Sequence, residues 1–361
     1  MDDYYLKFLH IVNEENYKPY YSNLGLQGSI FGNFNKTGFL KPGQNFNNYK
    51  AILSVISAVI FTFLIIWVIS NFGYIIGLSG FFFILQIDWL TVSASHFFWF
   101  SGLMFAAFVF NLFFIKKIER WKPDYINLLL LFIGNLIFSF SKCLSSGFEV
   151  IPTFLIMSTL PVFYYSIRFK YSIKLFTLLF VLVSGALLIG AASTMLIQAQ
   201  KIDKVEMRSG AGFEHLISSY ARRTSGSQKI RMNMRPKIKR SYTITAFEVV
   251  KMYWHSDIGK INVMNNKLEI KSSFFTYSLL LISMISILLY NRFSRHFFAI
   301  LITSWISILA PLSMFLLFKS LSFLHPHLVP ITWNMPFTIL VFLTLFYGLK
   351  KLFFNVSFPE M

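Results

Sequence analysis

Long apolar stretches separated by short polar connections make up most of the chain after residue 49. The hydrocarbon core of a bilayer matches about 20 apolar residues in a helix. Ala51 to Gly73 alone supplies 23 residues without a charge. Nine stretches predict membrane spans: Ala51–Gly73, Tyr74–Ala94, Phe97–Ile115, Tyr125–Ser141, Val150–Ile167, Leu175–Ala199, Ser272–Tyr290, Phe297–Phe318 and Val329–Leu349. The pattern indicates an all-α, polytopic transmembrane helix bundle.

The second stretch is shorter than the others. Its uninterrupted apolar run begins at Tyr74, ends at Ile87 and contains 14 residues. It reaches membrane thickness only if the helix continues through Asp88 to about Ala94. Such a helix places an acid near one membrane face, where a charge is costly enough to indicate function.

The composition supports the same class of protein. Hydrophobic residues make up 55% of the chain, charged residues only 13%, and the mean hydropathy is +0.60. The net charge of +18 fits Lys and Arg at the ends of membrane spans, so we do not expect nucleic acid as a partner. The single cysteine, Cys143, excludes an intramolecular disulfide and a cysteine-built metal site.

Polarity divides the chain into four parts. Residues 1–49 form a polar and aromatic N-terminal segment, and residues 50–199 form a membrane domain with spans one to six. Residues 200–271 form a basic loop or small subdomain, with 15 Lys and Arg against 6 Asp and Glu. Residues 272–361 contain spans seven to nine and a short tail.

The distribution of Lys and Arg predicts the orientation. Connections after spans three, five, seven and nine hold 11 Lys and Arg, whereas those after spans two, four and eight hold only Lys142 and Lys319. Positive charge stays on the cytoplasmic side, so the odd-numbered ends are expected there. The basic segment 200–271 and the N-terminal segment 1–49 then face outside.

An outer N-terminal segment needs a way across the membrane. No signal peptide or span precedes it in the sequence. We therefore expect that a first transmembrane helix is missing upstream of Met1. The alternatives are a tail that crosses unaided, or an inverted topology in which the short second stretch is re-entrant.

Candidate binding chemistry begins in the N-terminal segment. Glu14 and Glu15 precede a stretch rich in Tyr, Gln and Gly, in which Tyr21 and Gln27 are candidate sugar-binding residues. Tyrosine stacks on sugars, and a nearby carboxylate suits a general base toward an acceptor hydroxyl. The alternative is an aromatic belt at the membrane interface.

Three further candidates lie in predicted outer connections. Asp88 and His96 bracket a stretch with three hydroxyl side chains, and Glu149 precedes the fifth span. Asp88 suits a second acid that positions an acceptor or a metal, while His96 and Glu149 suit substrate contacts. An ordinary loop, and a helix cap at Glu149, are the competing interpretations.

The segment 200–271 contains a dense basic run that includes Arg222, Arg223 and Arg235. Such a run predicts a clamp on phosphate of a lipid-linked donor, although a disordered basic loop is the alternative. Thr245 and Glu248 have capping-box spacing, which predicts a following amphipathic helix. We expect its aromatic residues, through Trp254, to rest in the membrane interface like a lid.

Short motifs resemble the GT-C class of membrane glycosyltransferases that use polyprenyl-phosphate sugars. They are Tyr20-Tyr21-Ser22-Asn23-Leu24-Gly25-Leu26-Gln27-Gly28, Leu78-Ser79-Gly80 before the aromatic Phe97-Phe98-Trp99, and Gly147-Phe148-Glu149. The likeness covers residues 14 to 168. GT-C enzymes carry acids in the loop after a first helix, which is absent here, and the nearest acids are Glu14 and Glu15.

The resemblance implies a transferase in the bacterial inner membrane. It implies a polyprenyl-phosphate-linked sugar as donor, a cell-envelope glycan or lipid as acceptor, and surrounding membrane lipids as partners. Whether the chain is enzymatically active, and whether a divalent metal is needed, stays open. The alternatives are a transporter or flippase for lipid-linked glycans, and a degenerate non-enzymatic membrane protein.

Overall fold

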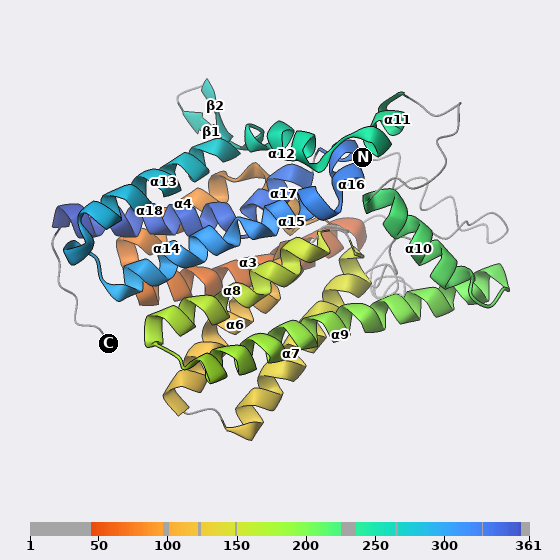
Figure 1. Ribbon diagram of the computed structural model, residues 1–361, viewed down its shortest axis with the longest axis horizontal. Coiled ribbons are helices and arrows are strands. Elements are labelled where there is room, and N and C mark those ends of the chain that lie inside the picture. The colour runs from red at the N-terminus through yellow and green to blue at the C-terminus, as the bar shows by residue number, and fades with distance from the viewer. Residues whose placement is uncertain are drawn as a thin grey trace.

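The computed structural model describes residues 45–96, 101–121, 124–148, 150–224, 236–263, 266–326 and 328–354. These segments are almost entirely helical, and their helices run mostly along one long axis (Figure 1). The membrane helices and their short partners are α3 (Asn45–Phe72), α4 (Tyr74–Gln86), α5 (Asp88–Ala94), α6 (Ser101–Trp121), α7 (Tyr125–Ser146), α8 (Ile151–Phe169), α9 (Ile173–Glu206), α13 (Ser272–Leu288), α14 (Arg295–Ser307), α15 (Leu309–Leu317), α16 (Lys319–Leu324), α17 (Leu328–Asn334) and α18 (Phe337–Phe354).

The remaining elements lie between α9 and α13 in the sequence, and together we call them the cap. They are α10 (Ala211–Thr224), α11 (Pro236–Thr243), α12 (Ala246–Trp254), β1 (Asp257–Val263) and β2 (Asn266–Lys271). A short 3-10 helix, η2 (Tyr290–Arg292), joins α13 to α14.

Helices occupy all nine predicted spans, which confirms the all-α bundle of a membrane protein. Five described helices are long and apolar enough to cross a bilayer: α3, α6, α7, α9 and the α14–α15 pair. A bent pair, α17 with α18, supplies a sixth, its two halves meeting at 42°. The helices α4 and α13, with 13 and 17 residues, are apolar but shorter. The proline-containing α8 is not among the helices that meet the length and hydropathy needed to cross a bilayer.

The continuous helix that we predicted through Asp88 is wrong. The helix α4 ends at Gln86, Ile87 adopts an extended backbone conformation, and Asp88 begins the separate helix α5. Thirteen residues rise only about 20 Å, which is less than the hydrocarbon thickness.

The ends of α3, α8 and α18, three of the odd-numbered spans, lie together with the start of α14. Arg168 near the end of α8 bonds to Asn71 near the end of α3, and Arg295 at the start of α14 bonds to the carbonyl of Ile167. Lys350 near the end of α18 bonds to the carbonyl of Phe72 at 3.2 Å. These helix ends lie at the opposite end of the long axis from α10 and α11 of the cap (Figure 1), and we call them the basic end.

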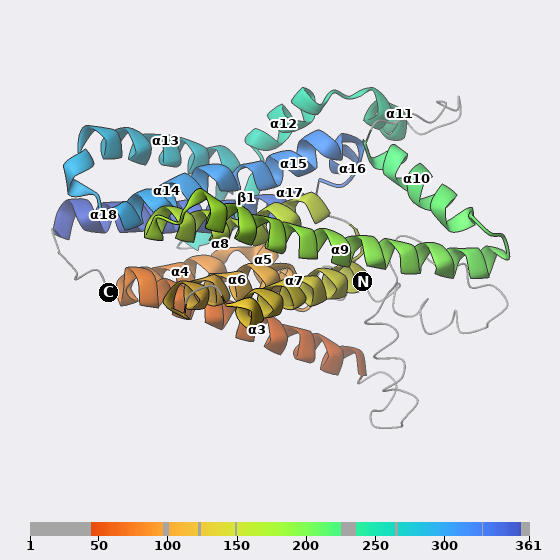
Figure 2. The ribbon, with the colours of Figure 1, turned by 60° about the horizontal axis from the view of Figure 1, so that its bottom comes forward.

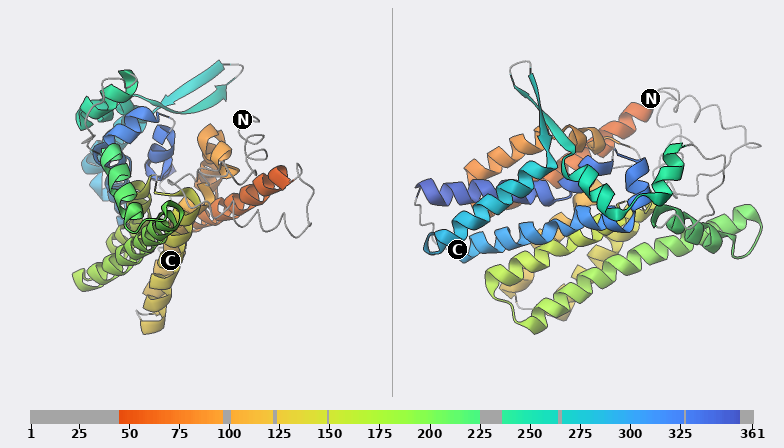
Figure 3. Two further views of the ribbon diagram at one scale, coloured as in Figure 1. Left: turned by 90° about the vertical axis from the view of Figure 1, so that its right-hand side faces the viewer. Right: turned by 45° about the horizontal axis from the view of Figure 1, so that its top comes forward.

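The segment 200–271 is more structured than the loop that its polarity suggests. The helix α9 continues through it to Glu206, and β1 pairs antiparallel with β2 in a hairpin that projects from the helices (Figure 3). Thr245 and Glu248 form the predicted capping box at the start of α12. The cap is tied to the bundle by hydrogen bonds from Tyr253 to the Ser322 carbonyl and from Ser320 to the Ser241 carbonyl.

The aromatic residues of α12 depart from the predicted lid. Tyr253 is buried against Phe315, with ring centroids 5.2 Å apart, and Trp254 is half-buried against Trp333. These rings therefore pack against the protein, because α12 lies on α15 and α16. Phe247 and Met252, in contrast, are exposed on the same helix.

The helices α7 and α9 approach each other closely at Gly190. A Cβ atom there would lie 2.7 Å from the Leu136 carbonyl oxygen and 3.0 Å from the Phe140 nitrogen. Ser139 also donates a hydrogen bond to the Leu187 carbonyl across this contact. Small residues allow such backbone approach in membrane helices, where packing and hydrogen bonds replace the hydrophobic effect.

We expect Gly190→Ala to destabilise the bundle by about 1–3 kcal/mol, because the added methyl group overpacks a contact with backbone atoms. The measurement is thermal unfolding of the purified protein in detergent. Gly185→Ala in the same helix is the control, because its Cβ atom would meet nothing within 4 Å. Equal melting temperatures for the two variants would contradict the close contact.

Candidate functional site

The helix α9 is longer than the membrane. Its 34 residues rise about 51 Å, whereas about 20 residues cross the hydrocarbon core. The last two turns, from Lys201 to Glu206, are polar and charged. The end of α9 therefore extends beyond the bilayer at the cap.

The chain reverses after α9 and returns as α10, so the two helices lie against each other (Figure 2). Met207 and Gly210 adopt left-handed backbone conformations in this turn, with φ of 49° and 83°. Gly212 then packs directly on α9, since a Cβ atom there would lie 2.1 Å from the Ala199 carbonyl oxygen. Its amide also donates to the Asp203 carboxylate at 2.7 Å. Only glycine fits this approach, which fixes α10 relative to α9.

An open cleft of about 320 Å³ lies between the two helices, and we call it the α9–α10 cleft. Its walls combine two carboxylates, one arginine, one imidazole and one hydroxyl with two apolar side chains. They are Glu206, Arg208, Glu214, His215, Ser218, Ile202 and Ala211. This is a polar site outside the spans, suited to a hydroxyl-bearing ligand.

One wall of the cleft is an exposed ion pair. Arg208 bonds to both carboxylate oxygens of Glu214, at 3.1 and 2.6 Å. The Arg208 guanidinium lowers the pKa of Glu214 through these hydrogen bonds and its charge. Because both side chains are exposed, the pair adds little stability, and its role is to hold the two side chains at the mouth of the cleft.

His215 is the titratable group best placed for proton transfer. Partial burial, then the charges of Arg222 and Arg223, lower the pKa of His215. Its Nε2 lies 3.2 Å from the Ser219 hydroxyl, which accepts a hydrogen bond of 2.9 Å from Arg222. The imidazole is therefore neutral at neutral pH, which a general base requires.

The predicted site residues fall into three groups. Glu14, Glu15, Tyr21, Gln27, Glu149 and Arg235 lie outside the described residues. Arg222 and Arg223 are in the last turn of α10, beside His215.

Asp88 and His96 form the third group, away from the cleft. Asp88 is the first residue of α5 and His96 follows its last turn, so they lie at opposite ends of that helix. Burial and the charge of Lys50 lower the pKa of His96. The structure places His96 beside α3 and the arginines on α10, so the described members of the predicted set lie in two separate places.

Sequence reasoning missed Glu206, Glu214 and His215. A signal was present, because His215, Ser219 and Arg222 are spaced four and three residues apart and so share one face of a helix. These residues come close to Glu206 only because the chain reverses between α9 and α10, and no local sequence pattern predicts that reversal.

No group of three or more His, Cys, Asp or Glu side chains arranged to hold a metal ion occurs within the described part of the chain. The described residues therefore offer no ligand set for the divalent metal that the sequence left open. Comparison with models of protein families, with curated proteins and with solved structures finds no match.

We expect the double variant Arg222→Gln, Arg223→Gln to raise the pKa of His215 toward its ordinary value. Removing two positive charges stabilises the imidazolium, so protonation occurs at higher pH. The measurement is an NMR titration with labelled histidine. Lys251→Gln, an exposed change on α12, is the control, and an unchanged pKa in the double variant would contradict the proposed influence of the arginines.

Proposed function

We propose that this protein is a membrane glycosyltransferase of the GT-C type in the bacterial cytoplasmic membrane. It moves a sugar from a polyprenyl-phosphate donor to a cell-envelope acceptor at the outer face. The observation that carries the proposal is the α9–α10 cleft, in which the His215 imidazole lies beside two carboxylates at the point where α9 leaves the bilayer. Arg222 and Arg223, whose charges help to lower the pKa of His215, follow in the last turn of the same helix. A lipid-linked donor presents its phosphate at this level.

The cleft supplies the groups that such a transfer needs. His215 takes the proton from an acceptor hydroxyl, and the hydroxyl oxygen attacks the anomeric carbon of the donor sugar. The bond from that carbon to the phosphate oxygen breaks, and the polyprenyl phosphate leaves with the bonding electrons. Arg222 and Arg223 stabilise the negative charge that develops on the phosphate, by charge-assisted hydrogen bonds.

The carboxylates have a positioning role in this proposal. Glu206 and Glu214 accept hydrogen bonds from the other hydroxyls of a sugar, as acceptor-only groups do. The roles of Glu15 or Glu14 as base and of Asp88 as second acid stay predictions from the sequence. Variants of these residues belong in the same assay.

The orientation is supported by the separation of charge along the bundle. Cations at the basic end lie in short connections between spans, which is the distribution that keeps that end in the cytoplasm. The cap is basic as well, but it belongs to a long polar segment, and long segments cross regardless of charge. The cleft then faces the outer side, where polyprenyl-phosphate sugars donate to envelope glycans.

A direct test is sugar transfer by the purified chain in proteoliposomes. The probe is a radiolabelled polyprenyl-phosphate monosaccharide with a lipid-extracted envelope fraction as acceptor. We expect His215→Ala to lower transfer by about 100-fold or more, because general-base catalysis contributes that much. The double variant Arg222→Ala, Arg223→Ala should lower it by a similar factor, because charge on the leaving phosphate loses its partners.

His255→Ala is the matched control, because His255 is exposed at the end of α12 and does not line the cleft. Its transfer rate should equal that of the parent protein. Unchanged transfer in the His215 and arginine variants would rule out the cleft as the active site. Absence of transfer by the parent protein would rule out the activity with that donor.

The orientation is tested by labelling with a membrane-impermeant maleimide. We expect Lys239→Cys in the cap to react in intact cells and Lys174→Cys at the basic end to react only after permeabilisation, because both positions are exposed on opposite ends of the bundle. The native Cys143 is buried, so the parent protein gives the background. If only Lys174→Cys is labelled in intact cells, the orientation is the opposite of the one proposed, and the cleft does not lie at the outer face.

A further inference from the structure

The basic end gathers cations from several helices around one histidine. Arg168 comes from α8, Lys351 from α18 and Lys116 from α6, and all three act electrostatically on the imidazole of His296 in α14. Lys350, next to Lys351, bonds to the last turn of α3. Helices that are distant in sequence therefore present positive charge at one place.

Arg168 is held by neutral partners. Its Nη1 donates to the Asn71 side-chain oxygen at 2.5 Å and to the Tyr164 hydroxyl at 2.9 Å. Its guanidinium also lies over the rings of Tyr164 and Phe169. Among the described residues the one ion pair is Arg208 with Glu214, so Arg168 has no carboxylate partner there. Its Nη2 and Nε remain as donors.

The rest of the cluster is held together by hydrogen bonds and ring stacking. The Tyr164 hydroxyl lies 2.6 Å from Nε2 of His296, and the imidazole stacks on Phe72 with ring centroids 4.8 Å apart. The Lys350 amine donates to the Phe72 carbonyl at 3.2 Å. Arg168 and Lys350 are thus fixed on the adjacent residues Asn71 and Phe72, at the end of α3 where carbonyl groups favour cations.

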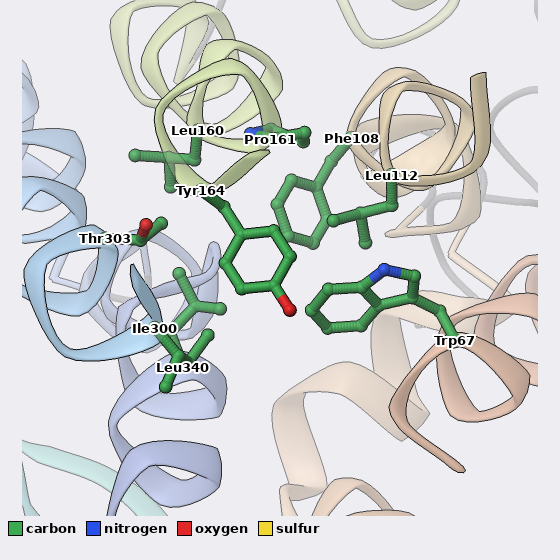
Figure 4. A pocket seen from close by; sticks show the side chains of 9 residues that line it. All are labelled: Trp67, Phe108, Leu112, Leu160, Pro161, Tyr164, Ile300, Thr303 and Leu340. Carbon is green, nitrogen blue, oxygen red and sulfur yellow. The ribbon is translucent and has the colours of Figure 1, made fainter. Parts of the chain in front are cut away.

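The interior next to this cluster offers no room for a ligand. The void beside Tyr164 measures about 10 Å³ and has mostly apolar walls, and Figure 4 shows the Tyr164 hydroxyl directed toward the Trp67 ring. A ligand therefore approaches from the end of the bundle, at the level of the lipid headgroups. Basic pockets between helices on the cytoplasmic side bind phosphate-bearing headgroups.

We propose that Arg168, Lys350 and Lys351 bind a phosphate group, with Asn71, Tyr164 and His296 holding the cluster together. Arg168 offers two donors to one phosphate, and the two lysines contribute positive charge from the neighbouring helix. The phosphate belongs to an anionic lipid headgroup or to a free phosphate ion. The site lies at the opposite end of the bundle from the α9–α10 cleft, so it is independent of the proposed transferase activity.

The test uses the full chain in detergent, with phosphatidylglycerol, phosphatidylcholine and inorganic phosphate as probes. Thermal unfolding and native mass spectrometry report binding. We expect phosphatidylglycerol to raise the melting temperature and phosphatidylcholine to leave it unchanged. Arg168→Gln should weaken phosphatidylglycerol binding by about fivefold or more, the effect of one cation near a charged lipid.

Arg292→Gln is the matched control, because Arg292 is exposed at the same end without belonging to the cluster. Should Arg168→Gln fail to fold, the double variant Lys350→Gln, Lys351→Gln replaces it. Displacement of the lipid by millimolar inorganic phosphate supports the site with free phosphate as the ligand, and retention of the lipid supports a headgroup. Equal binding by Arg168→Gln and Arg292→Gln, or equal effects of the two lipids, would overturn the proposal.

Discussion

A polar group that enters the hydrocarbon core is costly without a partner within the protein, and the architecture depends on how partners are supplied. At the centre of the bundle, Asn111 of α6 and Asn135 of α7 exchange two side-chain hydrogen bonds of 2.8 Å, and Asn111 also bonds to the Ser158 carbonyl of α8. This arrangement joins three helices through buried amides. Hydroxyl side chains such as Thr194 and Ser304 instead bond to carbonyls one turn earlier in their own helices. Interhelical bonds of this kind are worth about 0.6–2 kcal/mol each, so many of them are needed to fix the bundle.

Close contact between helix backbones is the second feature on which the bundle depends. In lipid the hydrophobic effect does not drive helices together, so tight packing has to do so. Gly190 brings α9 against α7 inside the membrane, and Gly212 brings α10 against α9 beyond it. One long helix therefore connects the packed bundle with the cleft. The position of His215 on α10 relative to Glu206 on α9 depends on the contact at Gly212.

The sequence predicts features that depend on local chemistry and misses those that depend on distant contacts. Apolar length located helices at all nine predicted stretches, and the capping box at Thr245 and Glu248 formed as predicted, because both signals lie in local sequence. The break at Ile87 was not predicted, since the apolar run continues up to the acid. Tyr253 was expected at the lipid interface, but its hydroxyl bonds to Ser322, 69 residues later. Arg222 and Arg223 were predicted from the sequence to bind an anion, and that stays a prediction, whereas His215 became a candidate only when α10 was found to fold back on α9.

The two phosphate-binding proposals use arginines in different surroundings. Arg222 faces the solvent and Arg168 lies against the protein, and this changes how strongly each attracts a phosphate. Arg222 in the cap is exposed, so water and salt screen its attraction for phosphate to about 1 kcal/mol at 4 Å. Arg168 is half-buried among aromatic rings, where an effective dielectric constant of about 20 raises the same attraction to about 4 kcal/mol. A weak, screened contact suits a donor whose phosphate must leave after each transfer. A stronger contact held by Asn71 and Tyr164 suits a phosphate that stays bound, so the two proposals assign turnover to one end of the bundle and retention to the other.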